Sequence, residues 1–202
     1  MNPNGLPMQV TISFRDQIMA RYANQMGALG AGQAQAALAR ALRHTGAKAR
    51  TRVIRALTAQ TGLKRATIVK AVREMRGDAA ALEFVLRTQG GNVRLHHFKA
   101  RETRKGVSAA PWGQRQVYPG TFMKAGWWHS RRVGKPNWNG QVFARAGGMT
   151  KTGRDKFEVQ RSGLYIPTEM LTGETAQAFQ DLIRSDLMPR VGHELGRMLP
   201  GR

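Results

Sequence analysis

The stretch GALGAGQAQAALARALRHTGAKARTRVIRALTAQTGLKR, residues 27 to 65, decides how this chain is expected to fold. Its larger apolar residues recur with the spacing of one helix face, and the same face continues back to residue 18. Glycine weakens a helix by about 1 kcal/mol relative to alanine, so the three glycines at 27 to 32 predict a bend or break. Thr61-Gly62 ends the pattern. The sequence thus predicts a long N-terminal helix with an apolar side made of Ile18, Tyr22, Met26, Leu29, Leu38, Leu42, Val53 and Leu57.

Shorter elements are expected on both sides of this helix. Alternating apolar residues predict an opening strand from Gln9 to Phe14, and Leu63 to Glu74 reads as a second, shorter helix. From Ala81 the apolar period changes from about 3.6 to 2, which predicts a hairpin around the turn at 89 to 92. Short strands joined by long loops are expected near residues 107, 117, 121 and 142, with a last strand from Phe157 to Arg161.

The chain is expected to close with a helix over residues 172 to 199. Thr172 is a suitable N-cap, and Pro189 should kink or split the helix near Leu187. We therefore expect a single domain over 1–202 with an α+β fold, in which a small antiparallel sheet is packed by the long, broken helix, the short second helix and the C-terminal helix. Its parts are a basic helical part at 15–76, a β-rich part at 81–166 and the closing helix. The residues expected to be mainly buried are Val10, Ile12, Leu82, Phe84, Leu86, Val93, Leu95, Ile183, Val191 and Leu195.

Charge is the strongest compositional signal. The chain has 33 Lys and Arg against 12 Asp and Glu, a net charge of +21, which attracts polyanions and repels other copies of itself. No acidic residue occurs between Gln17 and Arg73, whereas the segment from Pro167 to the end is close to neutral. An anionic partner, either DNA or an acidic protein surface, is therefore expected. The candidate contacts are Arg40, Arg43, Lys48, Arg50, Arg52, Arg55, Lys64, Arg65, Lys70 and Arg73.

The sequence contains no recognisable catalytic set, so we expect neither enzymatic activity nor a cofactor. Without cysteine there are no disulfides and no thiolate chemistry. His96, His97 and His129 could meet at a metal, but neighbouring strand residues point to opposite faces and no carboxylates accompany them, so no metal site is expected. No apolar run reaches the length of about 18 residues that a membrane helix needs, and the N-terminus lacks a signal-peptide pattern.

Two alternatives concern the basic and aromatic residues. The segment 57–75 has the spacing of a helix-turn-helix, which would make the chain a sequence-specific or architectural DNA-binding protein with Lys64 and Arg65 in the major groove. A packed helix pair has the same spacing. The tryptophans among the basic loops could stack on bases, but they are more typical of a protein interface, for which the candidates are Trp127, Trp128 and Trp138.

Several segments, taken in their order along the chain, resemble the minor tail protein Z family of lambda-like siphophages. The resemblance spans nearly the whole chain, although the Trp127-Trp128 stretch and the loop to Asn139 depart from it. The segments that carry it are Thr61-Gly62-Leu63-Lys64-Arg65, Phe98 to Ala109, Gly120-Thr121-Phe122, Val142-Phe143-Ala144-Arg145 and Leu187 to Leu195.

This resemblance implies a tail completion protein that acts without catalysis. Such a protein sits at the head-proximal end of the tail, takes part in tail assembly and head-tail joining, and helps make the particle competent to deliver DNA. The expected partners are the tail terminator and tail tube proteins, with neck proteins, the tape measure and non-specific phage DNA as further candidates. The expected assembly is a homo-oligomeric ring, a hexamer by the symmetry of the tail tube. The expected location is the virion, with assembly in the host cytoplasm.

Overall fold

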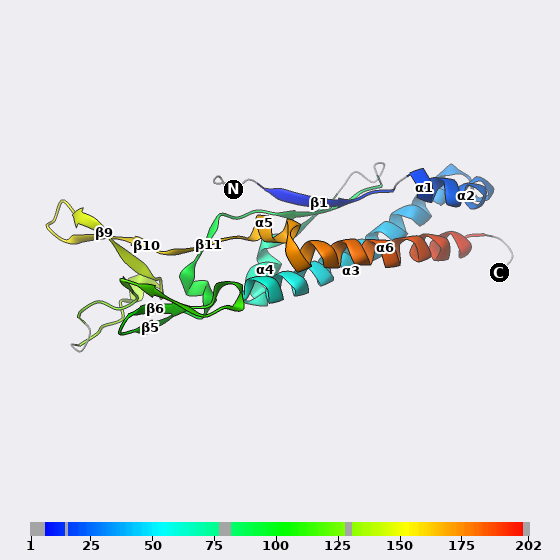
Figure 1. The fold of residues 1–202 in the computed structure, drawn as a ribbon. Coiled ribbons are helices and arrows are strands. Elements are labelled where there is room, and N and C mark those ends of the chain that lie inside the picture. Colours follow the sequence, from blue (N-terminus) through cyan, green and yellow to red (C-terminus); the bar gives the residue numbers. More distant parts are fainter. Residues whose placement is uncertain (1–6, 15, 77–81, 128–130, 200–202) are drawn as a thin grey trace.

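The computed structural model describes residues 7–14, 16–76, 82–127 and 131–199. It confirms the expected α+β class, since long helices and several small antiparallel sheets together form an elongated molecule (Figure 1). The long helices gather toward one end, and the sheets of the β-rich segment form the other end. No described helix is both long and apolar enough to cross a membrane.

The long N-terminal helix is broken at the predicted place, between Leu29 and Ala31, and also at Tyr22, where no break was predicted. The helices are α1 (Asp16–Arg21), α2 (Ala23–Leu29), α3 (Ala31–Thr61), α4 (Arg65–Ala71), α5 (Ile166–Leu171) and α6 (Gly173–Gly196). Between α2 and α3, Gly30 has a φ of 77°, a conformation that residues with a Cβ rarely adopt. A second glycine ends α3, because Gly62 has a φ of 72° and its N–H donates to the carbonyl of Thr58.

Helix α6 packs along α3 in the opposite direction. The contacts between the two helices run from Arg40 and Glu194 at one end to Gln60 and Thr175 at the other. Small, fully buried residues form part of the α3 face that meets α6, since Ala37 and Ala41 lie in one stripe with Thr45, whose hydroxyl donates to Asp186. Small side chains allow the two backbones to approach closely. The four apolar residues predicted for this part of the helix, Leu38, Leu42, Val53 and Leu57, are all buried.

Pro189, which was predicted to kink or split the closing helix, does not split it, because α6 continues from Gly173 to Gly196. A proline inside a helix removes one backbone hydrogen bond and costs about 3 kcal/mol. Leu187 and Val191, on either side of the proline, are both buried in the core. Their packing holds the helix together across the proline.

The N-terminus of α6 is capped by a residue from another helix. Thr172 is the N-cap residue as predicted, but its side chain makes no capping hydrogen bond. Instead, Oε1 of Gln60 on α3 accepts hydrogen bonds from the backbone N–H of Thr175 at 3.0 Å and from the Thr175 hydroxyl at 2.8 Å. The amide of Gln60 also donates to Glu169 on α5. The sequence does not predict α5, which lies along the chain between the last strand and α6.

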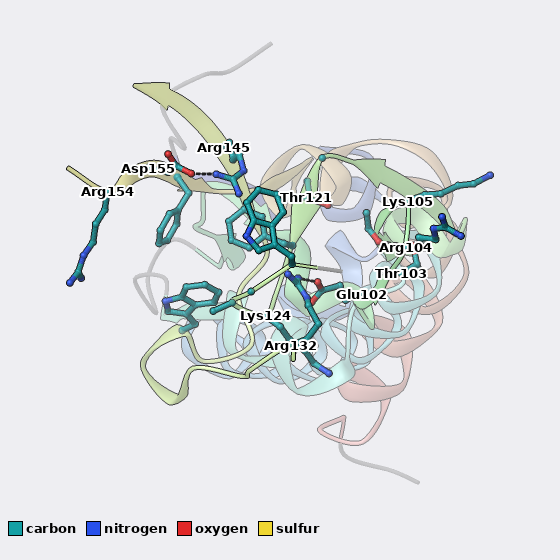
Figure 2. Close-up of a pocket in the computed structure, with 18 residues that line it drawn as sticks. Glu102, Thr103, Arg104, Lys105, Thr121, Lys124, Arg132, Arg145, Arg154 and Asp155 are labelled. Carbon is teal, nitrogen blue, oxygen red and sulfur yellow. Dashed lines mark hydrogen bonds and ion pairs between the residues drawn. The ribbon is translucent and has the colours of Figure 1, made fainter. Parts of the chain in front are cut away.

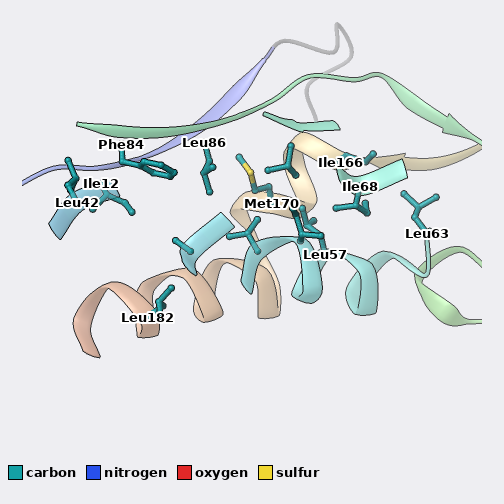
Figure 3. Packing of buried hydrophobic residues seen from close by; sticks show 14 of the residues in the cluster. Ile12, Leu42, Leu57, Leu63, Ile68, Phe84, Leu86, Ile166, Met170 and Leu182 are labelled. Atoms are coloured by element: carbon teal, nitrogen blue, oxygen red, sulfur yellow. The ribbon is translucent and has the colours of Figure 1, made fainter. Parts of the chain in front are cut away.

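One sheet covers the helix pair. Its three antiparallel strands lie in the order β1 (Met8–Ile12), β3 (Phe84–Thr88) and β2 (Val72–Arg76). The register places Phe84 opposite Ile12, and both side chains are buried, so the inward face of the sheet joins the helical core (Figure 3). The opening strand is thus confirmed.

The short second helix is present but ends earlier than predicted, and one predicted element is wrong. The short helix does not extend to Glu74, since α4 ends at Ala71 and the chain continues as strand β2, where the buried Val72 gains more from the sheet than from another helical turn. The predicted hairpin at 81 to 95 does not form either. Strand β3 pairs with β1 and β2, whereas β4 (Asn92–Arg94) pairs with β11 (Arg161–Tyr165). Alternation along a strand indicates which face is buried but not which strand lies beside it.

The β-rich half consists of short strands, as predicted. One sheet has the order β5 (Arg101–Thr103), β6 (Gly106–Ala109) and β7 (Gln116–Pro119); another has the order β10 (Asp155–Val159), β9 (Phe143–Met149) and β8 (Thr121–Phe122). The predicted last strand at 157 to 161 is in fact the end of β10 and the start of β11. Strands β9 and β10 form a hairpin that projects from this end of the molecule (Figure 1). Short 3-10 helices at Leu95–Phe98, Pro111–Gly113 and Pro136–Trp138 connect the strands.

The predicted core is confirmed in the main. Of the ten residues expected to be buried, Ile12, Phe84, Leu86, Leu95, Val191 and Leu195 are buried, and Val10, Leu82, Val93 and Ile183 are half-buried against the same cluster.

Sheet and helix meet most closely at Gly46, in the middle of α3. A Cβ built at this position would overlap the ring of Phe84 on β3. Only a glycine therefore lets the ring lie flat against the helix. By contrast, a Cβ at Gly32, in the first turn of α3, would meet nothing within 4 Å.

Substitution of Gly46 tests this contact. Gly46→Ala should lower the free energy of unfolding by about 1–3 kcal/mol because the core becomes overpacked, although alanine is the better helix former. Gly32→Ala, the matched control, should leave stability unchanged or raise it by up to about 1 kcal/mol. Urea unfolding followed by circular dichroism measures both changes.

The same experiment in a second background identifies the clashing group. Phe84→Ala alone should cost about 3–5 kcal/mol, and in this background Gly46→Ala should no longer destabilise. An equal cost of Gly46→Ala in both backgrounds would show that the ring of Phe84 is not what limits the space at Gly46.

Candidate functional site

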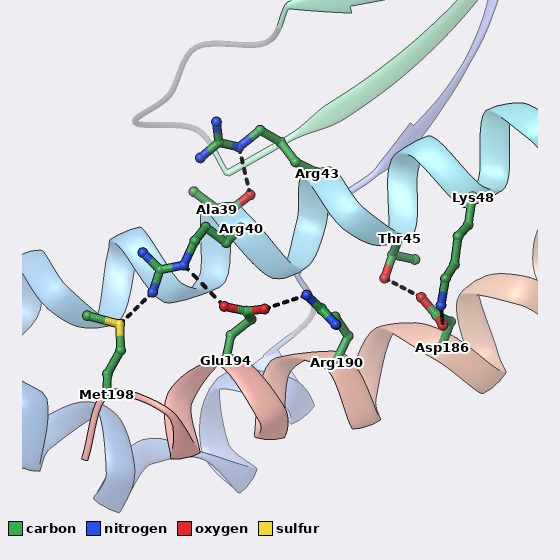
Figure 4. A network of polar contacts seen from close by, with 9 residues as sticks. All are labelled: Ala39, Arg40, Arg43, Thr45, Lys48, Asp186, Arg190, Glu194 and Met198. Atoms are coloured by element: carbon green, nitrogen blue, oxygen red, sulfur yellow. Dashed lines mark hydrogen bonds and ion pairs between the residues drawn. The ribbon is translucent and has the colours of Figure 1, made fainter. Parts of the chain in front are cut away.

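The ten basic residues predicted to contact an anionic partner do not form one surface. Two of them face α6 and are held by its carboxylates. The Arg40 Nε donates to Glu194 at 3.1 Å, and the Lys48 Nζ donates to Asp186 at 2.6 Å (Figure 4). The acidic residues that make the C-terminal segment nearly neutral thus serve in part to pair with cations of α3. Arg40 and Lys48 thus stabilise the helix pair, and part of their charge is already neutralised within the protein.

Glu194 is the more deeply buried of the two carboxylates, with an exposed fraction of 2%. Burial alone would raise its pKa, but the hydrogen bond from Arg40 and the charges of Arg190, Arg197 and Arg40 outweigh burial and hold the pKa below its usual value. Arg190 contributes directly, since its Nη2 lies 2.6 Å from Glu194. The pKa of Asp186 is lowered in the same way, with burial opposed by hydrogen bonds from Lys48 and Thr45.

Five more of the candidates lie apart from one another or beside acidic groups. Arg52 and Arg55 line a shallow depression between α3 and α6 that also contains Glu174 and Asp181, so its charge is mixed. The exposed Arg43 donates to the carbonyl of Ala39 on its own helix. Lys64 and Arg65, also exposed, lie where α3 passes into α4.

The remaining candidates, Arg50, Lys70 and Arg73, converge with Arg87 at one corner of the molecule, which we call the basic corner. They line two adjoining hollows of about 510 and 450 Å³ that share Lys70 and Arg73, and Glu74 also lines the first. The side chains come from α3, α4, β2 and β3 respectively. Among the described residues, none of the four takes part in an ion pair.

Arg87 was not among the predicted contacts, because only the strand register brings it to this corner. Arg73 on β2 and Arg87 on β3 are direct cross-strand partners. Like charges directly opposite each other on a sheet are destabilising. An anion bound at the basic corner would relieve this repulsion, so the arrangement is suited to binding phosphate or carboxylate groups.

Two of the described tryptophans, Trp127 and Trp138, lie in the β-rich part. Trp138 packs with Phe122, Phe143 and Phe157, with ring centroids 5.0–6.1 Å apart. Trp127 is 75% exposed, and the guanidinium of Arg145 lies over its ring. Trp128 lies outside the described residues. The remaining tryptophan, Trp112, donates from Nε1 to Glu169 at 2.9 Å.

Four aromatic residues, Phe122, Trp127, Trp138 and Phe157, line a groove of about 530 Å³ between the β5–β6 turn, the segment after β8 and the β9–β10 hairpin. We call it the aromatic groove (Figure 2). Two of its arginines are held by carboxylates, Arg132 by Glu102 and Arg145 by Asp155. Of the predicted site residues, Trp127 and Trp138 are brought together here, and no residue of the basic corner lines this groove.

The paired histidines make no metal site in the described part of the chain. The rings of His96 and His97 lie with centroids 3.8 Å apart, and burial together with the nearby charge of Arg94 lowers the pKa of both. No group of three or more potential ligands is found among the described residues. His129 lies outside them.

The carboxylate pairs generate a pH prediction. A carboxyl group with a lowered pKa in the folded state stabilises the fold above its unfolded-state pKa, and this stability is lost as the pH falls through the folded value. The protein should therefore lose stability between about pH 5 and pH 2. Glu194→Gln should cost about 2–3 kcal/mol at neutral pH and should flatten this acid dependence.

Thermal unfolding across this pH range provides the measurement, and Glu174→Gln on the same helix is the matched control. Glu174 is exposed and is not part of an ion pair among the described residues. An acid dependence that is the same in Glu194→Gln as in the natural protein would show that Glu194 does not stabilise the helix pair through its charge.

Comparison of the chain with protein-family models, with curated proteins and with solved structures found no match. The resemblance to the minor tail protein Z family stays a prediction that rests on the quoted residues.

Proposed function

We propose that this chain is a non-enzymatic structural protein of a phage tail, a tail completion protein that acts at the head-proximal end in tail assembly and head-tail joining. The resemblance of its segments to the minor tail protein Z family suggests this role. The described structure is consistent with it, because its distinctive surfaces are a cluster of cations and an aromatic groove, both suited to binding partners. A hexameric ring next to the tail terminator and tube proteins belongs to the same proposal.

The observation that carries a DNA-contacting role is the basic corner. Four cations from four different elements meet there, and two of them are directly opposite each other on adjacent strands. Lysine and arginine side chains that contact phosphates supply sequence-independent affinity, and each contact releases counterions. In a ring that surrounds or adjoins the DNA path, the basic corner would hold the duplex without reading bases.

Net charge supports an anionic partner in the assembled state. Copies that each carry +21 repel one another, so a closed ring of them needs neutralisation from DNA or from acidic neighbours. Within the described residues, five ion pairs use only part of the positive charge. The unused cations are available for assembly.

The geometry favours backbone contact over the helix-turn-helix alternative. In the segment 57–75, the helix that would read the major groove is α4, which has only seven residues and passes directly into strand β2. Its Ile68 is fully buried in the core. A recognition helix must enter the groove with several side chains in reach of base edges. This short helix, tied at its end to a sheet, offers little surface for that.

The basic corner predicts weak, salt-sensitive binding to double-stranded DNA. Replacing Arg50, Lys70, Arg73 and Arg87 together by Gln should weaken binding to any duplex equally, and each lost phosphate contact should reduce the slope of log K against log salt by about 0.9. Fluorescence anisotropy with duplexes of unrelated sequence, at several salt concentrations, measures both quantities.

A second variant removes the same net charge elsewhere. Arg101, Lys135, Lys151 and Arg184 are exposed and lie outside the basic corner, and their replacement by Gln should leave the salt slope nearly unchanged. Equal losses in both variants would show that only net charge matters and that the basic corner is not a DNA site. A salt-tolerant preference for one sequence would instead support the alternative of a sequence-specific DNA-binding protein.

The assembly role predicts the phenotype of a phage that lacks this chain. Heads filled with DNA and tails of normal length should still form, but few infectious particles should result, because the tails cannot be joined productively. Electron microscopy of lysates and plaque titres measure this, and transcription of phage genes should be unchanged. A normal titre, or altered transcription with normal joining, would contradict the proposal.

A further inference from the structure

We propose that the aromatic groove at the β-rich end is a docking site for an extended, acidic segment of another protein, one that inserts an apolar side chain between Phe157 and Trp127. This surface is separate from the basic corner, so the proposal does not depend on DNA binding. Its volume of about 530 Å³ falls within the range of about 300–1,000 Å³ typical of ligand pockets.

The wall of the groove requires an apolar partner. Phe157 is 43% exposed and Trp127 is 75% exposed, although both are large apolar side chains. Phe157 lies next to Trp138 and Phe122, which continue the apolar surface inward, and Trp127 lines the same groove. Covering such side chains contributes roughly 25 cal/mol for each Å² removed from water. A ligand with only charged groups would leave these apolar side chains exposed to water.

The rim of the groove requires an anionic partner. Arg104 and Lys105 project from the β5–β6 turn, Lys124 follows β8, and Arg154 precedes β10, and all four are exposed. The two carboxylates of the groove do not neutralise them, because Glu102 pairs with Arg132 and Asp155 with Arg145. The described rim thus keeps four cations without a carboxylate partner, arranged around an apolar wall (Figure 2).

The ring geometry favours a protein segment over a nucleic acid. Bases bind to aromatic side chains by stacking on an open ring face. In the groove, Phe157 meets Phe122, Trp138 and Phe143 edge to face, with interplanar angles of 60–78°. The ring of Trp127 already has the guanidinium of Arg145 over it. These contacts occupy ring faces that a stacked base would need, so the groove suits an aliphatic or aromatic side chain better than a base.

The occupant is not a second copy of this chain. Each copy carries +21, and the acidic residues of its closing helix are partly used by Arg40 and Lys48. Bringing the basic rim of one copy to another would add to the repulsion between them. A partner of opposite charge would instead be attracted and oriented by the rim, while the apolar wall holds it in register.

The test uses the full chain and short fluorescein-labelled peptides. The first peptide has one phenylalanine flanked by acidic residues, and the second has serine in place of that phenylalanine. A single-stranded oligothymidine of equal formal charge is the third probe. We expect the phenylalanine peptide to bind about tenfold tighter than the serine peptide, and tighter than the oligothymidine. Fluorescence anisotropy at constant salt measures all three.

Variants assign the binding to the groove. Phe157→Ser and, independently, Trp127→Ser should remove the preference for the phenylalanine peptide, whereas Lys124→Gln with Arg154→Gln should weaken both peptides alike. Met149→Ser is the matched control, because Met149 is 67% exposed on the same hairpin but does not line the groove. Thermal unfolding confirms that each variant folds.

Three results would overturn the proposal. Equal affinity for the two peptides would show that charge alone drives binding. Tighter binding of oligothymidine that is lost in Trp127→Ser would make the groove a nucleic-acid site. A phenylalanine preference that survives both Phe157→Ser and Trp127→Ser would place the apolar contact elsewhere on the protein.

Discussion

The antiparallel packing of α6 on α3 is the interaction on which the rest of the structure depends. Alanines on α3 let α6 approach closely, and Gln60 of α3 caps the first turn of α6. The opposite side of α3 carries the sheet, with Phe84 lying against Gly46. A single helix, α3, thus organises two layers. The segment between β3 and β11 can form the β-rich half because both ends of that segment are held by this core.

The same helix pair determines how the large positive charge is distributed. Carboxylates of α6 neutralise two cations of α3 at their seam, which stabilises the core and removes those cations from any binding surface. Other contacts determine where the remaining positive charge lies. At the basic corner the strand register sets Arg73 opposite Arg87. Like charges directly opposite each other destabilise a sheet, so an anion bound there would relieve this repulsion.

The β-rich half follows a different physical rule, because it has few long strands and only a small share of the core. Its loops are held by ion pairs such as Arg132 with Glu102, and by edge-to-face packing of aromatic rings. Some large apolar side chains, Trp127 among them, stay exposed at its end. A helical half that provides stability and a loop-rich half that offers binding surface follows the general rule that binding residues lie on loops positioned by a rigid scaffold.

The sequence by itself determined the features that depend on local pattern. The break at Gly30, the end of α3 at Gly62, the opening strand and the burial of Leu38, Leu42, Phe84 and Leu86 follow from periodicity and from glycine conformation. The excess of positive charge and the position of the tryptophans among basic loops were equally visible. These signals come from residues near one another in the chain, where spacing alone fixes which side chains share a face.

Only the tertiary structure decided what depends on partners far apart in the chain. Strand β3 pairs with β1 and β2 instead of forming a hairpin, Val72 continues as a strand, and α6 persists through Pro189 because the core holds both flanks. The sequence also did not show which basic residues form ion pairs within the protein and which stay available to a partner. Whether Arg40 meets DNA or Glu194 depends on which helix packs beside it. Long-range packing outweighs local preferences of about 1–3 kcal/mol, and those contacts have no signature in local spacing.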